Sequence, residues 1–134
     1  IVPVTVDWDR DGDMDLVSAN QNGDNLTLFF QTSPGDFTQQ TTTLPVGVAP
    51  RAVTAADLDG DGDMDLVSGG INSNNLTLYL QKDTEPGAFE QATATLPVGS
   101  ARAVVAADLD GDGDLDLVAA DQQSSALKIF SNGK

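Results

Sequence analysis

The stretch "DLDGDGDMDLV" (Asp57–Val67) places five aspartates at alternate positions over nine residues, with glycines between them. Carboxylates this close repel one another, so they must take up protons, move apart or bind a cation. The aliphatic pair Leu66 and Val67 then begins a segment typical of a β-strand. The stretch therefore predicts a tight turn between strands that is complete only with a bound cation.

The same stretch occurs three times along the chain. The first aspartates of the copies are Asp7, Asp57 and Asp108, so the repeat period is 50 and then 51 residues. The likeness extends beyond the acidic segment, since "DMDLVSANQNGDNLTLFFQ" in the first copy is matched by "DMDLVSGGINSNNLTLYLQ" in the second. Differences in length are confined to turns, as expected for stacked copies of one supersecondary unit.

Within a unit, short alternating segments predict β-strands. "RAVTAAD" leads into the acidic loop, "DLVSGG" leads out of it, and "NLTLYLQ" and "FEQATATLPV" follow. No apolar stripe with helical spacing persists for more than a turn or so. The connecting segments carry turn residues, namely Asn22-Gly23, Pro34-Gly35, Pro86-Gly87 and Asn132-Gly133.

Four strands in about 50 residues are typical of one β-propeller blade. We therefore predict an all-β fold of four-stranded antiparallel blades, with about 2.75 blades in one segment of residues 1–134. The predicted blades are residues 1–47, 48–99 and, incomplete, 100–134. Propellers close with about four to eight blades. We expect a piece of a longer propeller, or copies of the chain that join.

The net charge of −15 is concentrated in the acidic loops. Residues 7–15, 57–65 and 108–116 hold 15 of the 21 acidic residues and a single base, Arg10. With only six Lys and Arg in all, the chain is a poor partner for nucleic acid. No apolar run approaches the roughly 20 residues of a transmembrane helix.

Catalysis has little support in the composition. The chain has no His and no Cys, and most of its carboxylates belong to the acidic loops. The remaining acids fall mainly in predicted turns, which does not suggest the paired carboxylates of a glycosidase. We therefore predict a protein that is not an enzyme; these other acids are Asp24, Asp36, Asp83, Glu85, Glu90 and Asp121.

The spacing within each acidic loop suits Ca²⁺. Such ions bind six to eight oxygens at about 2.3 to 2.6 Å, supplied by alternate side chains and a backbone carbonyl, whereas Mg²⁺ demands octahedral geometry and keeps its waters. Glycine at position 6 permits the sharp reversal of the loop. We predict three Ca²⁺ sites with the side chains of Asp7, Asp9, Asp11 and Asp15, of Asp57, Asp59, Asp61 and Asp65, and of Asp108, Asp110, Asp112 and Asp116, and the carbonyls of Asp13, Asp63 and Asp114.

Two other interpretations of the loops were weighed. Asp-Gly clusters also form ordinary β-turns, but three copies in register, each with the same carboxylates, favour a metal loop. An EF-hand would need a bidentate Glu at position 12 and flanking helices. Strands are predicted on both sides, and position 12 is Ser18, Ser68 or Ala119.

The segment "GVAPRAVTAADLDGDGDMDLVSGG" (Gly47–Gly70) resembles the FG-GAP or VCBS repeat, a calcium-loop blade of integrin α-subunit propellers and of many bacterial and fungal extracellular propellers. The resemblance implies that the loops join the first two strands of each blade and lie on one face. The first copy departs from it, with Arg10 in place of Gly60 and Pro3 in the leading strand. Because position 4 supplies no side-chain ligand, we expect cation binding to survive there.

The resemblance also implies a role outside the cell, as a secreted or cell-surface module. Binding of a carbohydrate or protein ligand, as in lectins and adhesion receptors, is the leading hypothesis for its function. A structural spacer or self-assembling filament unit is one alternative. An accessory domain beside a polysaccharide-active enzyme is another.

Three further features of the sequence have a structural interpretation that is favoured over a functional one. Arg51 and Arg102 occupy equivalent positions and indicate a structural salt bridge or a solvated turn more than a ligand site. Trp8 replaces Leu58 and Leu109 and is interpreted as a core or interblade residue before a sugar platform. The N-glycosylation patterns at residues 25–27 and 75–77 each begin a predicted strand, so coincidence with strand chemistry is favoured.

Overall fold

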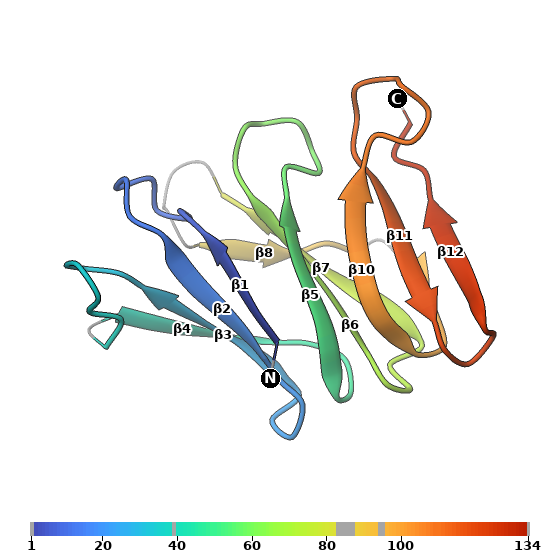
Figure 1. Ribbon diagram of the computed structural model, residues 1–134, viewed down its shortest axis with the longest axis horizontal. Coiled ribbons are helices and arrows are strands. Elements are labelled where there is room, and N and C mark those ends of the chain that lie inside the picture. Colours follow the sequence, from blue (N-terminus) through green and yellow to red (C-terminus); the bar gives the residue numbers. More distant parts are fainter. Residues whose placement is uncertain (1, 39, 83–87, 94–95, 134) are drawn as a thin grey trace.

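The computed structural model describes residues 2–38, 40–82, 88–93 and 96–133, and this part of the chain contains strands and no helix. The strands form separate antiparallel sheets that lie side by side (Figure 1). This confirms the predicted all-β class with antiparallel blades. The predicted turn at Pro86-Gly87, with Asp83 and Glu85, lies outside the described residues.

The first sheet, which we call the first blade, has four strands in the order in which they follow along the chain. Each strand pairs antiparallel with the next, and Val17 on the second strand pairs with Val4 on one side and Leu28 on the other. The strands are β1 (Val2–Val6), β2 (Asp15–Asn20), β3 (Asn25–Phe30) and β4 (Gln40–Pro45).

The second blade repeats this order but divides its outermost strand. We predicted one strand over "FEQATATLPV", whereas the structure forms two short strands there that both pair with β7. Ala92 still donates its N–H to the carbonyl of Leu78, so the pairing with β7 continues just past the first piece. The strands are β5 (Pro50–Ala56), β6 (Asp65–Gly70), β7 (Asn75–Gln81), β8 (Phe89–Gln91) and β9 (Leu96–Pro97).

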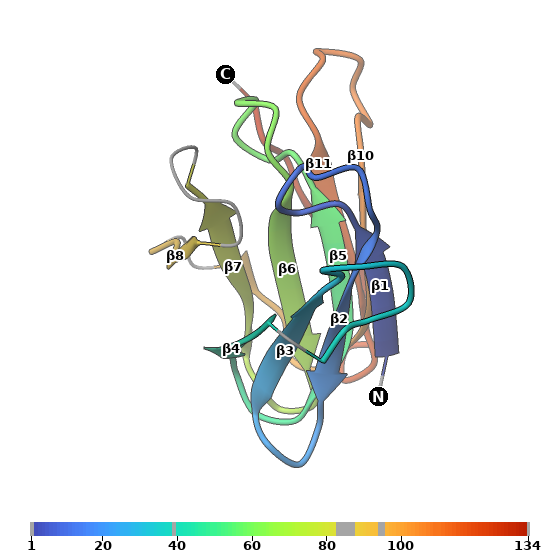
Figure 2. The same ribbon diagram turned by 90° about the vertical axis from the view of Figure 1, so that its left-hand side faces the viewer.

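The third blade has three strands among the described residues, as predicted for an incomplete unit. They are β10 (Ala101–Ala107), β11 (Asp116–Asp121) and β12 (Ala126–Phe130). β5 packs against β1 and β2, and β10 packs against β5 and β6. Figure 2 shows β1, β5 and β10 along one side of the molecule and β4 and β8 on the opposite side.

Side-chain alternation explains where the core forms. Successive residues of a strand face opposite sides of the sheet, and in β3 Leu26, Leu28 and Phe30 are buried while the residues between them are partly exposed. The middle strand of the second blade, β6, is buried at every position because a blade covers each of its faces. The core therefore lies between the blades.

Two apolar clusters fill these contacts. The first joins the first and second blades and contains Trp8, Val17, Ala19, Leu26, Leu28, Phe30, Leu44, Val53, Leu66 and Tyr79. The second joins the second and third blades and contains Ala52, Val67, Leu76, Val98, Ala101, Val104, Leu117 and Ala119. Trp8 is an interblade residue, as predicted, with 1% of its surface exposed.

Arg51 and Arg102 mark irregularities in the innermost strands. The register of β5 with β6 shifts between Pro50 and Ala52, and that of β10 with β11 shifts between Ala101 and Ala103. Each arginine is therefore the extra residue of a β-bulge. Neither forms an ion pair in the part of the chain that the structure describes, which corrects the salt-bridge prediction. Arg102 instead donates from Nε to Gln122 Oε1 at 2.5 Å.

Candidate metal sites in the acidic loops

The acidic loops join the first two strands of each blade and lie together at one end of the molecule (Figure 1). In the second loop, Gly60 and Gly62 have φ angles of 80° and 93°, and the third loop repeats this geometry. Glycine adopts such angles without strain, whereas other residues rarely do. Position 4 therefore needs a left-handed backbone, a requirement that the sequence reasoning missed. In the first loop, Arg10 takes this conformation with φ 59°.

Aspartate side chains fold each loop by accepting its own backbone N–H groups. Asp57 accepts from Gly60 and Gly62 at 2.8 and 3.0 Å. Asp59 and Asp61 each accept the N–H two residues further on, at 3.2 and 2.8 Å. The third loop has the same four bonds, at 2.7, 3.1, 3.2 and 2.9 Å. These Asx turns draw the carboxylates toward the inside of the loop.

The aspartate at position 9 has a second role that the sequence did not reveal. One carboxylate oxygen accepts the N–H of position 2, and the other accepts an N–H at the end of the third strand of the blade or just beyond it. The aspartate thus ties the start of the loop to a segment that lies 16 residues beyond the aspartate itself. These buried aspartates are Asp15, Asp65 and Asp116, with 0, 0 and 1% of their surfaces exposed; their N–H donors are Trp8 and Gln31, Leu58 and Gln81, and Leu109 and Asn132.

The structure gathers three of the predicted side-chain ligands in each loop. In every group the ligand atoms lie within 4.8 Å of one another. The aspartates at positions 1 and 3 belong to all three groups, while Asp11, Asp65 and Asp112 lie outside them. The groups are Asp7, Asp9 and Asp15; Asp57, Asp59 and Asp61; and Asp108, Asp110 and Asp116.

The first loop leaves one carboxylate oxygen without a partner. In the other loops this oxygen, Oδ1 of position 1, accepts the N–H of the glycine at position 4. Among the described residues, Asp7 accepts only the N–H of Gly12, through Oδ2 at 3.1 Å, and its Oδ1 is buried with no hydrogen-bond partner there. An unpartnered buried oxygen is costly unless something else binds it. A cation would satisfy this atom.

Electrostatics in the loops favour the uptake of positive charge. Burial raises the pKa of Asp65 to about 6, and nearby Asp59 and Asp61 add to this, although two backbone N–H groups act in the opposite direction. Burial and the neighbouring charge of Asp15 likewise raise the pKa of Asp9. Burial raises the pKa of Asp59, with a further contribution from the adjacent charge of Asp61. Carboxylates in this state gain from a proton or a cation.

The aspartate at position 9 of the third loop has its pKa shifted in the opposite direction to that of Asp65. Hydrogen bonds from the N–H groups of Asn132 and Leu109 lower the pKa of Asp116. The equivalent Asp65 makes the same two bonds but lies between neighbouring blades, and burial outweighs them there.

Contacts between blades position the loops relative to one another. Gln81 donates from Nε2 to the carbonyl of Trp8 at 2.6 Å, and Asn132 donates from Nδ2 to the carbonyl of Leu58 at 2.7 Å. In the second and third blades, the end of the third strand therefore holds the loop of the preceding blade.

Arg10 and Asp63 form an ion pair between the first and second loops. The side chain of Asp63, at position 7, is 4% exposed. We expected this carboxylate only to add negative field, so its pairing with a neighbouring blade is new information. The pair could not be read from one repeat, because its members belong to different copies.

Asn25 and Asn75 begin β3 and β7, as the sequence predicted. The side chain of Asn25 accepts a hydrogen bond from Asn20 and donates one to the carbonyl of Gly23. This amide thus contributes to the β2–β3 turn.

The sheets and loops define a β-propeller segment with one acidic hairpin in each blade. A profile of the FG-GAP-like repeat matches residues 7–68 and, overlapping them, residues 57–119. The chain belongs to the FG-GAP-like repeat family. A comparison with curated proteins gave no match. Within the described residues, no helix is long and apolar enough to cross a membrane.

Proposed function

We propose that this chain is a non-catalytic, calcium-stabilised propeller module that serves recognition or adhesion outside the cell. The observation that carries the calcium part is the repetition of one geometry. Three loops, in register and at one end of the molecule, each gather three carboxylates within 4.8 Å. Oxygen-only donor sets of this kind suit Ca²⁺.

The donors fit the ion in three respects. The buried Oδ1 of Asp7 has no other partner, the pKa values of Asp9 and Asp59 are raised, and glycine or Arg10 supplies the left-handed turn. The side chains at positions 1, 3, 5 and 9 and the carbonyl at position 7 would hold the ion. Three ions would offset six of the 15 net negative charges.

A bound cation would make each hairpin rigid through the residues around it. The aspartate at position 9 already links the loop to the end of the third strand, as Asp65 does between Leu58 and Gln81. Holding the carboxylates together would therefore stabilise a whole blade as well as its loop. This is a structural role, and it calls for no reacting group.

Recognition has support in a groove between the first two blades. The groove has a volume of about 740 Å³ and is lined by hydroxyl and amide side chains among apolar ones. Such groups suit a ligand rich in hydroxyls, or a polar peptide. Its polar lining residues are Ser73, Asn75, Thr77, Gln91 and Thr93.

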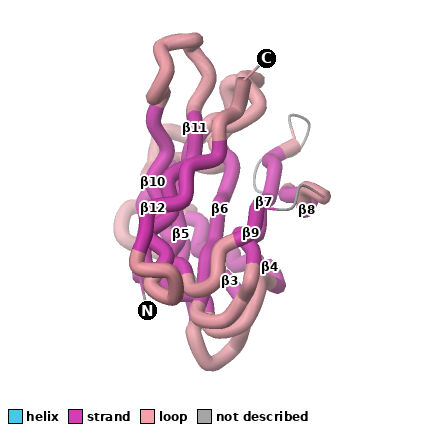
Figure 3. Tube along the Cα trace, turned by 90° about the vertical axis from the view of Figure 1, so that its right-hand side faces the viewer, coloured by secondary structure: helices cyan, strands magenta, loops and turns pink. Residues whose placement is uncertain are grey.

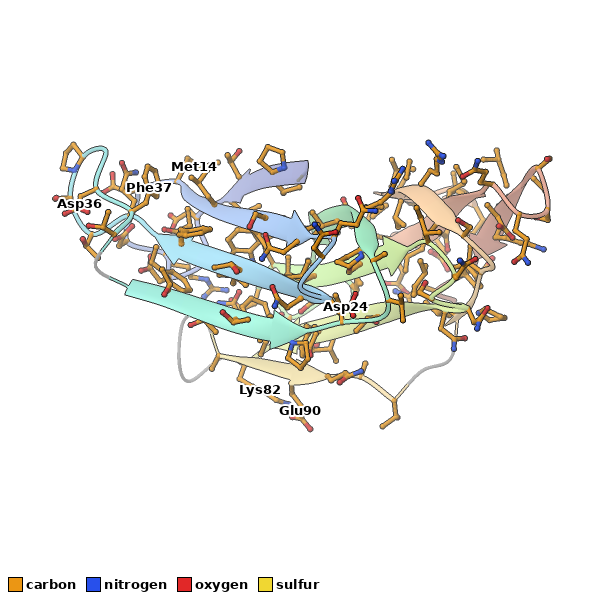
Figure 4. All side chains as sticks on the ribbon, turned by 90° about the horizontal axis from the view of Figure 1, so that it is seen from below. Met14, Asp24, Asp36, Phe37, Lys82 and Glu90 are labelled. Carbon is orange, nitrogen blue, oxygen red and sulfur yellow. The ribbon has the colours of Figure 1, made fainter. Side chains whose placement is uncertain are left out.

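Thermal unfolding with Ca²⁺ and with a chelator tests the calcium proposal. A ligand bound only by the native state stabilises it, by about 2.7 kcal/mol at a hundredfold excess over its Kd. We expect Ca²⁺ to raise the melting temperature and Asp57→Asn with Asp59→Asn to reduce that rise. Glu90→Gln on β8, in an exposed ion pair with Lys82 (Figure 4), is the matched control for lost charge. A melting temperature indifferent to Ca²⁺ would refute the proposal.

A glycan array probed in Ca²⁺ separates recognition from the alternatives. A recognition module should bind a restricted set of glycans, and binding should fall when the groove is changed by Asn75→Ala. A spacer or a filament unit should bind none selectively. Hydrolysis of a polysaccharide by the isolated chain would overturn the non-catalytic part.

A further inference from the structure

Each blade has two faces, and the interior contacts show what covers each. We call the face toward the next blade the trailing face, and the face toward the preceding blade the leading face. In the first interblade contact, Trp8, Leu26 and Leu28 supply the trailing face, and Leu66 and Tyr79 the leading face. Both sets are buried there, because the blades cover each other.

The trailing face of the third blade is open. Leu109, Leu127 and Ile129 occupy the positions of Trp8, Leu26 and Leu28 in the repeat. Their exposed fractions are 52, 67 and 60%, against 1, 0 and 0% in the first blade. No described strand lies beyond this blade on that side (Figures 1 and 3). Three large exposed apolar residues on one side of the blade, two on β12 and Leu109 in the acidic loop, indicate a surface that binds protein.

The leading face of the first blade is open at the other end of the molecule. Met14 is 51% exposed, whereas its equivalent Met64 packs against the first apolar cluster. Phe29 is partly exposed, whereas its equivalent Tyr79 is buried. Figure 4 shows Met14 at the outer side of the first blade, remote from the third.

The hydrogen bond of Gln31 shows the same difference between the first blade and the other two. Gln31 is the equivalent of Gln81 and Asn132, which both reach a carbonyl of the preceding blade. Gln31 instead donates to the carbonyl of Met14 in its own blade, at 3.1 Å. If a third blade lay against the leading face of the first blade, the equivalent acceptor for Gln31 would be the carbonyl of Leu109.

We propose that copies of this chain associate head to tail, with the trailing face of the third blade of one copy against the leading face of the first blade of the next. The argument is continuity with the interior contacts, because the open faces carry the residue positions that are paired twice inside the chain. The side chain of Gln31 would then donate its hydrogen bond to the Leu109 carbonyl of the neighbouring copy in place of the Met14 carbonyl of its own blade. Such a contact is heterologous, so repeated addition closes a ring or extends a filament.

Sedimentation velocity over a range of concentrations tests the proposal, with one variant for each face. Leu127→Asp with Ile129→Asp blocks the trailing face, and Met14→Asp blocks the leading face. Each should weaken self-association at least tenfold. Val48→Asp, at an apolar residue 55% exposed outside both faces, is the matched control and should associate like the unmodified chain. Circular dichroism verifies that all variants are folded.

A mixture of the two blocked variants gives the sharper result. Each retains one open face, so head-to-tail packing predicts a one-to-one complex that neither forms alone. An unmodified chain that stays monomeric at every concentration would overturn the proposal, as would a mixture that stays monomeric. Melting in Ca²⁺ is measured separately, so failure here leaves the calcium proposal standing.

Discussion

The two interblade contacts use the same repeat positions but fill them differently. The first contact has Trp8 and Phe30, where the second has Leu58 and Leu80. An apolar cavity of about 420 Å³ lies at the second contact, lined in part by those two leucines and Phe130. At these two positions one backbone plan thus carries larger side chains in the first contact than in the second, because side-chain volume sets local packing.

The first contact also has polar interactions that the second lacks at the equivalent positions. Tyr79 donates its hydroxyl to the carbonyl of Pro45 at 2.5 Å across the first contact, whereas the second has Phe130 at that position. The Arg10–Asp63 ion pair also belongs to the first contact, and position 4 of the second loop is a glycine. We therefore expect the first contact to be the stronger one.

The largest expected effect is that of Trp8→Ala. Removing a buried aromatic side chain costs about 4 kcal/mol of unfolding free energy, and Leu58→Ala about 2 kcal/mol because its site is already loosely packed. Urea unfolding at low protein concentration measures both. Leu109→Ala, at the equivalent exposed position, should change stability by less than about 0.5 kcal/mol. Equal losses at Trp8 and Leu58 would contradict the comparison.

The second contact has its own anchor in Asp121. Burial raises the pKa of this carboxyl, but hydrogen bonds from Ser124, Ser100, Gly99 and Gln123 outweigh it and lower the pKa to about 2. The N–H groups of Gly99 and Ser100, in the segment that joins β9 of the second blade to β10 of the third, donate to its oxygens at 3.3 and 3.0 Å. At this position the first two blades have Asn20 and Gly70.

We expect Asp121→Asn to destabilise the chain by less than Trp8→Ala does. A carboxyl whose pKa is lowered on folding stabilises the fold above its ordinary pKa, and this stabilisation is lost as pH falls. The difference in unfolding free energy between the unmodified chain and Asp121→Asn should be full at neutral pH and shrink from about pH 4 toward about pH 2. A difference independent of pH would show that the charge of Asp121 is not what anchors the blades.

The shared architecture could be predicted from sequence because it is local and repeated. Alternation within β3 and the turn residues between strands predict a sheet without knowledge of distant contacts. The groups around Asp7, Asp57 and Asp108 follow from spacing within nine residues. Repetition also placed Trp8 between blades, since its equivalents are leucines.

The features that distinguish the two contacts were not predictable in this way. The ion pair of Arg10 with Asp63 joins two repeats, so no pattern within one repeat contains it. The bonds of Asp65 depend on an N–H 16 residues away. The bulge at Arg51 depends on how two strands align, which residue types alone do not specify.

Gln81→Met should have a moderate effect. Gln81 is 4% exposed, and its loss leaves the carbonyl of Trp8 without this donor, at a cost of about 1.5 kcal/mol. Gln31→Met, in the equivalent but partly exposed position, removes two exposed bonds within its own blade, one to the carbonyl of Met14 and one from the N–H of Gly35, and should cost about 0.5 kcal/mol or less. Denaturant midpoints compare the two. If Gln31→Met cost as much, the bond between blades would have no special role.

Leu58→Trp should make the second contact more like the first. Filling the apolar cavity beside Leu58 and Leu80 should stabilise the chain by about 1 kcal/mol, as cavity-filling substitutions commonly do. Differential scanning calorimetry measures the gain. A loss of stability would mean that the indole is overpacked against Phe130, and that the backbone, more than side-chain volume, separates the two contacts.

Arg10→Gly should have the smallest effect on stability, because it removes one stabilising and one destabilising contribution from the first contact. The ion pair with Asp63 is lost, but a glycine relieves the φ of 59° that an L-residue adopts at a cost of about 1 kcal/mol. The net change in unfolding free energy should be within about 0.5 kcal/mol. Arg10→Ala loses the pair without that relief and should be less stable than Arg10→Gly at both low and high salt, because salt screens the ion pair and leaves backbone strain unchanged. Equal stabilities of the two variants would show that position 4 does not require a left-handed residue.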